Sequence, residues 1–231
     1  MGDGVGIMKA RWEQAHREPR FRPRYPHEKV VRWAFRSLDR ARRPPARVLD
    51  LGCGAGRHSL FLAAEGFDVD ACDISETGLE AVRQAATAAG LAVRTHAAPG
   101  HDLSHYPDGA FDAVLCFGVL YYMSLPNAER SVAEMRRVLA PGGKLCCVIR
   151  TDGDSRARHA RKVAPLTWRL DEVDAAAPSD GERGMDLLFF SEAETAALFS
   201  SFADVDIDRM TYVHKGFADD DWVVTAAKPV D

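Results

Sequence analysis

The spacing of apolar side chains divides the chain into a short N-terminal segment and a longer, regular part. Residues 1–27 show no clear periodicity and include three prolines. Over residues 27–42 apolar side chains recur at helical spacing, and Pro44 and Pro45 end that pattern. We therefore predict one helix before residue 46 and a different organisation after it.

Beyond residue 45, short apolar runs alternate with helical patterns. The runs predict strands at residues 46–51, 67–72, 91–96, 111–117 and 144–149, and the periodic segments predict helices at residues 58–65, 75–89 and 127–139. Ser191 and Glu194 form a capping box that begins a helix to residue 200. Residues 205–210 and 222–227 predict a last pair of strands at the sheet edge. Strands that are apolar almost throughout are typical of a parallel sheet covered on both faces, so we predict a three-layer α/β/α sandwich.

Residues 150–186 interrupt this rhythm, with mixed charge and few apolar runs. The stretch is longer than an ordinary connection, so we interpret the region of about 150–190 as an insertion that covers the active site. The chain then divides into an N-terminal lid or helical segment, residues 1–45, and an α/β domain, residues 46–231, that carries the insertion as a substrate cap.

Charge is distributed unevenly along the chain. Residues 1–47 hold 13 Lys and Arg against 5 Asp and Glu, a net of +8, and since the whole chain has −4, residues 48–231 carry −12. A basic segment attracts anionic ligands. A helix with a solvated face accounts for the same charge equally well.

The cysteines and the hydropathy pattern indicate the compartment. The five cysteines fall in or beside predicted strands and form no CxxC pair, which favours buried, reduced thiols over zinc or a redox couple. No apolar run reaches the roughly eighteen residues that a membrane span needs. The arginine-rich N-terminus has no apolar signal core. We therefore expect a cytoplasmic protein with no membrane attachment.

The most informative stretch is residues 48–56, Val-Leu-Asp-Leu-Gly-Cys-Gly-Ala-Gly. A predicted strand enters a glycine-rich turn that opens a helix, so bare backbone and unpaired helix N–H groups meet a ligand there. Asp73 ends the next strand, 21 residues after Gly52, where a carboxylate can accept both hydroxyls of a ribose. The spacing G-x-G-x-G, with Asp50 before it, disfavours a pyrophosphate and favours the amino group of an amino-acid ligand.

These motifs resemble a known family. Residues 50–57 (DLGCGAGR) resemble motif I of the class I S-adenosylmethionine-dependent methyltransferases, and the likeness continues through Asp73-Ile74-Ser75, residues 111–118 and residues 137–144. It covers roughly residues 46–150 in the family's order and spacing. The resemblance implies a Rossmann-like, mostly parallel seven-stranded sheet with an antiparallel last strand. It also implies S-adenosylmethionine as cofactor and S-adenosylhomocysteine as product.

The resemblance further implies roles for matching residues. Asp50 and the turn backbone are expected to hold the methionine portion, Asp73 the ribose, and Ile74 the adenine face, while Phe117 lies beside the ligand. The family usually has an acidic residue before the fourth strand, where this chain has Ala97-Ala98-Pro99-Gly100-His101-Asp102-Leu103, so we assign Asp102 and the Leu103 N–H to the adenine. The expected cofactor-binding set is Tyr25, Asp50, Gly52, Cys53, Gly54, Arg57, Asp73, Ile74, Asp102, Leu103, Phe117 and Gly118.

The sequence carries weaker signals for the residues that face the methyl acceptor. Methyl transfer needs alignment and exclusion of water more than covalent help, and a hydroxyl or amine acceptor gains from a general base. Tyr121 and Tyr122 follow the fourth strand, where relatives place residues that face the acceptor, although aromatic packing explains them equally well. His105 and His214 are further candidate bases. The chain has no Pro-Cys nucleophile, no Asn/Asp-Pro-Pro-aromatic motif and no His/Asp cluster, so we expect no metal.

The run from Arg20 to Pro26 (RFRPRYP) resembles the lid that precedes the first strand in small-molecule methyltransferases. Arginine can bind a carboxylate through two parallel hydrogen bonds. We therefore expect Arg20 and Arg24, together with Tyr122 and Arg150, to contact the acceptor, and Tyr25 to close over the methionine end. A basic surface loop is the alternative.

Together the motifs predict in-line methyl transfer to an oxygen or nitrogen atom of a small metabolite or natural product, an anionic one included, by a monomer or homodimer. An RNA methyltransferase that follows phosphates with the basic segment is the alternative, disfavoured by the acidic remainder and the lack of an RNA-binding motif. A cofactor-binding protein without catalysis is a third interpretation.

Overall fold

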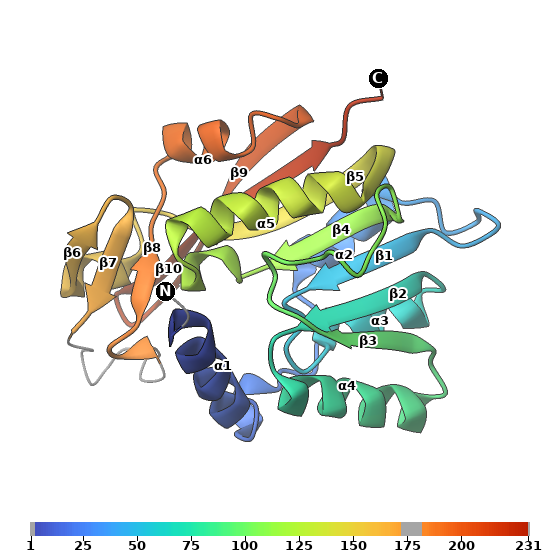
Figure 1. Ribbon diagram of the computed structural model, residues 1–231, viewed down its shortest axis with the longest axis horizontal. Coiled ribbons are helices and arrows are strands. Elements are labelled where there is room, and N and C mark those ends of the chain that lie inside the picture. Colours follow the sequence, from blue (N-terminus) through green and yellow to red (C-terminus); the bar gives the residue numbers. More distant parts are fainter. Residues whose placement is uncertain (1–2, 172–181, 231) are drawn as a thin grey trace.

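A seven-stranded sheet forms the centre of the molecule in the computed structural model, which describes residues 3–171 and 182–230. Its strand order is β3-β2-β1-β4-β5-β10-β9 (Figure 1). Strands β1 to β5 pair in parallel, whereas β10 is antiparallel to β5 and β9. The strands are β1 (Arg47–Leu51), β2 (Asp68–Asp73), β3 (Val93–Ala97), β4 (Phe111–Phe117), β5 (Leu139–Arg150), β9 (Ala203–His214) and β10 (Phe217–Ala227). The predicted fold class is confirmed.

Helices cover both faces of the sheet (Figure 1). Neighbouring residues of β1 point to opposite faces, as strand geometry requires: Val48 shares a core cluster with Trp33 of α2, and Leu49 shares one with Met135 of α5. The helices are α1 (Asp3–Ala15), α2 (Glu28–Ser37), α3 (Arg57–Ala64), α4 (Glu76–Ala89), α5 (Leu125–Val138) and α6 (Glu192–Leu198), with 3-10 helices η1 (Pro19–Phe21), η2 (Leu120–Tyr122) and η3 (Ser155–His159). The capping box predicted at Ser191 and Glu194 is present.

Most predicted boundaries agree with the structure to within two or three residues, and the main differences have local causes. Pro141, Gly142 and Gly143 were expected to separate a helix from a strand, but β5 begins at Leu139, directly after α5. The register of β5 against β4 shifts between Phe111 and Ala113, and this irregularity accommodates the proline and glycines. The last two strands form a hairpin, as predicted, and are longer than the predicted segments.

Two regions without a clear sequence pattern are also folded. Residues 3–15 form α1, where no helix was predicted. The insertion contains a second antiparallel sheet of order β6-β7-β8, made of β6 (Ala160–Ala164), β7 (Thr167–Leu170) and β8 (Asp186–Leu188). This small sheet has its own apolar cluster, which includes Leu187 and Phe189. Residues 172–181 of the predicted insertion lie outside the described residues.

The five cysteines are free and buried, as expected from their place in the strands. Within the described residues, no helix has the length and apolar character that crossing a membrane would require.

Candidate active site

The glycine-rich turn joins β1 to α3 at the carboxyl end of the sheet. Gly52 and Gly56 have φ angles of 70° and 85°, in the left-handed region that favours glycine. A Cβ on Gly56 would lie 2.6 Å from Cγ2 of Val82 in α4, so the turn is packed closely against that helix. The N–H groups of Gly52 and Cys53 both donate to the Cys72 carbonyl at the end of β2. The turn therefore presents bare backbone between the ends of β1 and β2.

Asp50 lies beneath this turn and is 1% exposed. The Ser59 hydroxyl donates to its Oδ2 at 2.5 Å. Burial raises the pKa of Asp50 to about 6, against the stabilising effect of the Ser59 hydrogen bond. A buried carboxylate with a single hydroxyl donor has acceptor capacity left for a cationic group.

Asp73, at the end of β2, faces the same turn. Its Oδ2 accepts the N–H of Gly54 at 2.8 Å, and its Oδ1 accepts the N–H of Ser75 at 2.8 Å. Burial raises the pKa of Asp73, and these two hydrogen bonds oppose the rise. Both predicted acidic residues are thus brought to one bend of bare backbone.

Aromatic and basic side chains surround Phe117 at the end of β4. The rings of His27 and His58 each lie 5.0 Å from the Phe117 ring, and the Arg57 guanidinium lies 5.2 Å over it. Burial lowers the pKa of His58 to about 3, so this imidazole is neutral and accepts the N–H of His27 at Nε2. This half-buried cluster covers the α3 side of the turn.

A buried ionic network lies beyond β4, between η2, the end of β5 and the insertion. Glu182 accepts the Tyr122 hydroxyl at 2.6 Å and an N–H of Arg150 at 3.0 Å. It also accepts the Nε–H of Arg156 from η3. The Arg150 guanidinium lies 4.1 Å over the Tyr121 ring. The network therefore fixes both tyrosines against the ends of β4 and β5.

Asp221 is a carboxylate that sequence reasoning missed. It pairs with Arg150 in the register of β10 and β5, so the two side chains share one face of the sheet. Its neighbours Asp154 and Asp219 accept from Arg156, and Asp220 accepts from Arg209. The Asp221 side chain is half-buried and forms no hydrogen bond or ion pair with a described residue. Burial raises the pKa of Asp221 to about 7, against the attraction of Arg150.

Comparisons with known proteins agree with this geometry. Residues 48–143 match the family model of a methyltransferase domain. The demethylmenaquinone methyltransferase of Thermus thermophilus is 40% identical over 119 residues, which are 50% of this chain and 52% of that protein. The ubiquinone biosynthesis O-methyltransferase of Aromatoleum aromaticum is 34% identical over 99 residues, 43% of this chain and 42% of that protein. The chain thus spans about half the length of the curated relatives it matches.

Over residues 48–143 the chain is therefore similar to methyltransferase domains. One solved methyltransferase of similar fold contains bound S-adenosylhomocysteine. The fold agrees with a solved S-adenosylmethionine-dependent methyltransferase of Methanosarcina mazei, with a TM-score of 0.72, 22% identity and coverage of 90% of this chain and 100% of that one. It also agrees with the 1,6-didemethyltoxoflavin-N1-methyltransferase of Burkholderia thailandensis, with a TM-score of 0.63, 23% identity and coverage of 99% and 82%.

The N-terminal residues that were expected at the candidate active site are exposed, and a different N-terminal residue lies against the glycine-rich turn. Tyr25 is 74% exposed. Arg24 lies over the Tyr25 ring, and Arg20 pairs with Glu18. By contrast His16, just after α1, is 5% exposed and lies against Gly54. Trp12 and His16 are spaced by one helical turn, and this spacing was the sequence signal that could have indicated a buried helix face here.

The remaining expected residues differ in burial and in the groups they contact. Cys53 is buried, Ile74 is half-buried beside Asp73, and Gly118 has a φ of 74° under the Tyr121 hydroxyl. Asp102 is exposed and accepts the N–H of Ser104, while Leu103 is buried and donates its N–H to Glu134 at 2.9 Å. His105 is exposed and lies against Tyr106, 4.1 Å between ring centres, and His214 is exposed on β9. The roles of these residues stay predictions.

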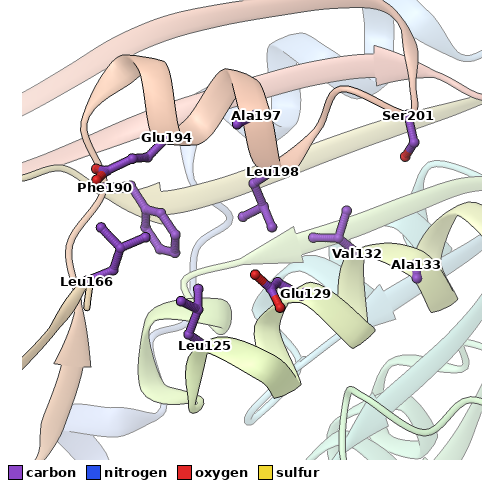
Figure 2. Close-up of a pocket in the computed structure, with 10 residues that line it drawn as sticks. All are labelled: Leu125, Glu129, Val132, Ala133, Leu166, Phe190, Glu194, Ala197, Leu198 and Ser201. Atoms are coloured by element: carbon purple, nitrogen blue, oxygen red, sulfur yellow. The ribbon is translucent and has the colours of Figure 1, made fainter. Parts of the chain in front are cut away.

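A separate groove of about 360 Å³ lies between α5 and α6 (Figure 2). Its walls include Val132 of α5, Leu198 of α6 and Phe190, which are largely apolar. Its lining residues come from neither the glycine-rich turn nor the ionic network. The groove is therefore distinct from the candidate active site.

Proposed function

We propose that this chain transfers the methyl group of S-adenosylmethionine to a hydroxyl oxygen or ring nitrogen of a small aromatic molecule. The observation that carries the proposal is that two buried carboxylates, Asp50 and Asp73, open on one glycine-rich turn of a class I methyltransferase domain. Relatives named for demethylmenaquinone and ubiquinone biosynthesis support an aromatic acceptor. An aromatic cluster supports it as well: the Tyr122 ring lies 4.9 Å from the Trp12 ring and 4.5 Å from the Tyr121 ring.

In this proposal the cofactor carries its methyl group on a cationic sulfur that becomes a neutral thioether on transfer. Asp50 binds the amino group of the methionine portion, with the Gly52 and Gly54 backbone beside it. Asp73 accepts the ribose hydroxyls, and Ile74 packs on the adenine. Asp102, Cys53, Arg57 and Gly118 are proposed as further contacts. The Leu103 N–H donates to Glu134 and is left out. Since Asp50 is held without a paired cation among the described residues, its ionised form gains from a ligand ammonium.

The acceptor is placed between the tyrosines and the ends of β4 and β5. Arg150 is already compensated by Glu182, so we assign it to positioning Tyr121 and not to an anionic substrate. Asp221 is assigned as proton acceptor. With the cofactor and acceptor bound, Asp221 would take the proton of the acceptor oxygen or nitrogen as that atom replaced sulfur on the methyl carbon.

The surrounding segments complete the proposal. The N-terminal 45 residues, Tyr25, Arg20 and Arg24 included, form a lid over a domain of residues 46–231. The region of about 150–190 forms a substrate cap. A cytoplasmic location and a monomeric or dimeric state also stay predictions.

The test compares ligands that differ in the group Asp50 is proposed to bind. Asp50→Asn keeps the shape and an acceptor for Ser59 but removes the charge. We expect calorimetry to show affinity for S-adenosylhomocysteine at least about tenfold weaker, since a hydrogen bond to a charged group contributes about 1.5–3 kcal/mol. Affinity for 5′-methylthioadenosine, which has no amino-acid portion, is expected to stay unchanged.

The matched control is Asp68→Asn, because Asp68 lies at the opposite end of β2 and pairs with Arg94. Wild-type protein, S-adenosylmethionine and a panel of catechols, hydroquinones and aromatic amines are then assayed for acceptor-dependent formation of S-adenosylhomocysteine. Failure of the wild-type protein to bind S-adenosylhomocysteine would overturn the proposal.

A further inference from the structure

Helix α1 crosses the carboxyl end of the sheet, near α4 on one side and the insertion on the other (Figure 1). The Trp12 ring packs against the Tyr122 ring at 4.9 Å, and Arg11 donates to the Arg183 carbonyl at 3.1 Å. The same helix therefore touches Tyr122 and the edge of the insertion.

Glu13 fixes the other side of α1 to the start of α4. Its carboxylate accepts the N–H of Glu76 at 2.8 Å and the N–H of Thr77 at 3.0 Å. These are N–H groups of the first helical turn, which have no partner within the helix. Burial opposes the charge, but the hydrogen bonds from Thr77 and Glu76 lower the pKa of Glu13 to about 2. Glu13 is thus a charged cap that holds α1 next to Asp73, which lies just before this helix.

His16 occupies a space that two glycines leave open. A Cβ on Gly54 would lie 3.2 Å from its Nε2, and a Cβ on Gly78 would lie 2.8 Å from its Nδ1. The imidazole is buried, and its Nδ1 has no hydrogen-bond partner among the described residues. His16 lies against Gly54, and the Gly54 N–H donates to Asp73. His16 is therefore beside the carboxylate that is assigned to the ribose.

The neutral form of His16 suits a hydroxyl ligand. Burial lowers the pKa of His16, against the attraction of Asp73, so the ring is neutral at pH 7. A neutral imidazole has one N–H donor and one acceptor nitrogen. A ribose hydroxyl can likewise donate to one group and accept from another.

We propose that α1 forms a wall of the cofactor site and that His16 hydrogen bonds to a ribose hydroxyl of the cofactor, next to Asp73. This inference rests on the proposed function, because it requires an adenosyl ligand at the glycine-rich turn. It adds a ligand-binding residue at the end of α1, more than thirty residues before the region that matches the methyltransferase domain.

The experiment is a cycle of ligands and variants measured by calorimetry. Wild-type protein, His16→Ala and a control variant are titrated with S-adenosylhomocysteine and its 2′-deoxy and 3′-deoxy analogues. The control is Gln14→Ala, at an exposed position near the end of α1. We expect His16→Ala to bind S-adenosylhomocysteine at least tenfold more weakly, with Gln14→Ala unchanged. The analogue that lacks the contacted hydroxyl is expected to bind wild type weakly and to lose no further affinity in His16→Ala.

Each other result counts against the inference. Equal affinity of wild type and His16→Ala for S-adenosylhomocysteine would show that His16 only fills space. An equal loss for all three ligands would exclude the ribose contact. Should His16→Ala fail to fold by circular dichroism, His16→Leu carries the same comparison, because leucine fills space without a hydrogen-bonding group. If wild type binds none of the ligands, the proposed function itself is wrong, so the two failures are distinguishable.

Discussion

Asp221 lies where carboxylates outnumber the arginines that can neutralise them. Arg156 forms ion pairs with Asp154, Glu182 and Asp219. Arg150 forms an ion pair with Glu182. A half-buried carboxylate with no bonded cation among the described residues keeps its proton to a higher pH. Asp154 and Asp219 add to this effect, while Arg150 and Arg156 oppose it. A proton acceptor near neutral pH is the consequence.

Asp221→Asn tests this assignment through two pH profiles. With an acceptor found in the panel, wild-type kcat is expected to rise with pH through about 7 as Asp221 loses its proton. The variant is expected to lose that rise and about 10²- to 10⁴-fold in kcat. Asp208→Asn, an exposed carboxylate of β9, is the control. A variant that keeps the rise and most of its rate would exclude Asp221 as the base.

The thermal stability of the same variant depends on pH in a direction that can be worked out. Folding raises the pKa of Asp221 from 3.8 to about 7, so the folded state binds the proton more tightly than the unfolded chain. Wild-type stability therefore falls as pH rises between these values, by at most about 4 kcal/mol. Asn removes that loss, so the variant should melt higher than wild type at pH 8 and at the same temperature near pH 4.

At the scale of elements, the sequence could predict a helix or strand where a short run of neighbouring residues specifies it. Short apolar runs and turn residues specify strands β1 to β4 and the glycine-rich turn, so these were predicted in the correct place and order. The same local pattern placed Asp50 and Asp73 at the ends of their strands. Helix α1 carries Gly4 and Gly6 and lacks an apolar stripe. It is stabilised by tertiary contacts such as Glu13 to α4. Periodicity within residues 1–27 could not reveal such contacts.

The ionic network was hidden from sequence for the same reason. Tyr122 and Glu182 are 60 positions apart, and Arg156 and Asp219 are 63 apart. Their pairing requires the return of the chain from the insertion to β10. Arg150, at the end of β5, was expected to contact the acceptor, and its pairing with Glu182 could not be predicted from the sequence.

Glu182→Gln tests how the insertion is held to the sheet. The substitution keeps the size of the side chain and removes the charge that Arg150 and Arg156 share. Removing one partner of a buried ion pair costs about 3–5 kcal/mol, which for a chain of this size lowers Tm by roughly 10 °C. Glu192→Gln, an exposed position in the first turn of α6, should change Tm by no more than about 2 °C. Calorimetric melting of both variants checks this, and equal melting temperatures would show that the network does not hold the insertion.

At the scale of the whole molecule, the uneven charge has a structural explanation. Four cations of the basic segment form ion pairs with acidic residues of the remainder: Lys29 with Asp208, Arg40 with Glu65, Arg42 with Asp112 and Arg47 with Asp70. The +8 segment therefore docks against the −12 remainder and is partly neutralised by it. This arrangement favours a small-molecule acceptor over RNA, because a phosphate track requires uncompensated cations in a row.

The last prediction concerns RNA binding and its dependence on salt. If these four cations are engaged by the protein itself, a short single-stranded RNA should bind with a Kd no tighter than about 0.1 mM at about 0.15 M salt. Fluorescence anisotropy from low to physiological salt measures this. Arg40→Ala and Arg42→Ala should leave the weak binding unchanged, because their guanidinium groups already pair with Glu65 and Asp112. Micromolar binding whose logarithm falls with the logarithm of salt at a slope of about −4 or steeper would indicate several phosphate contacts. It would restore the RNA methyltransferase interpretation, since the ion pairs would then have to open for RNA.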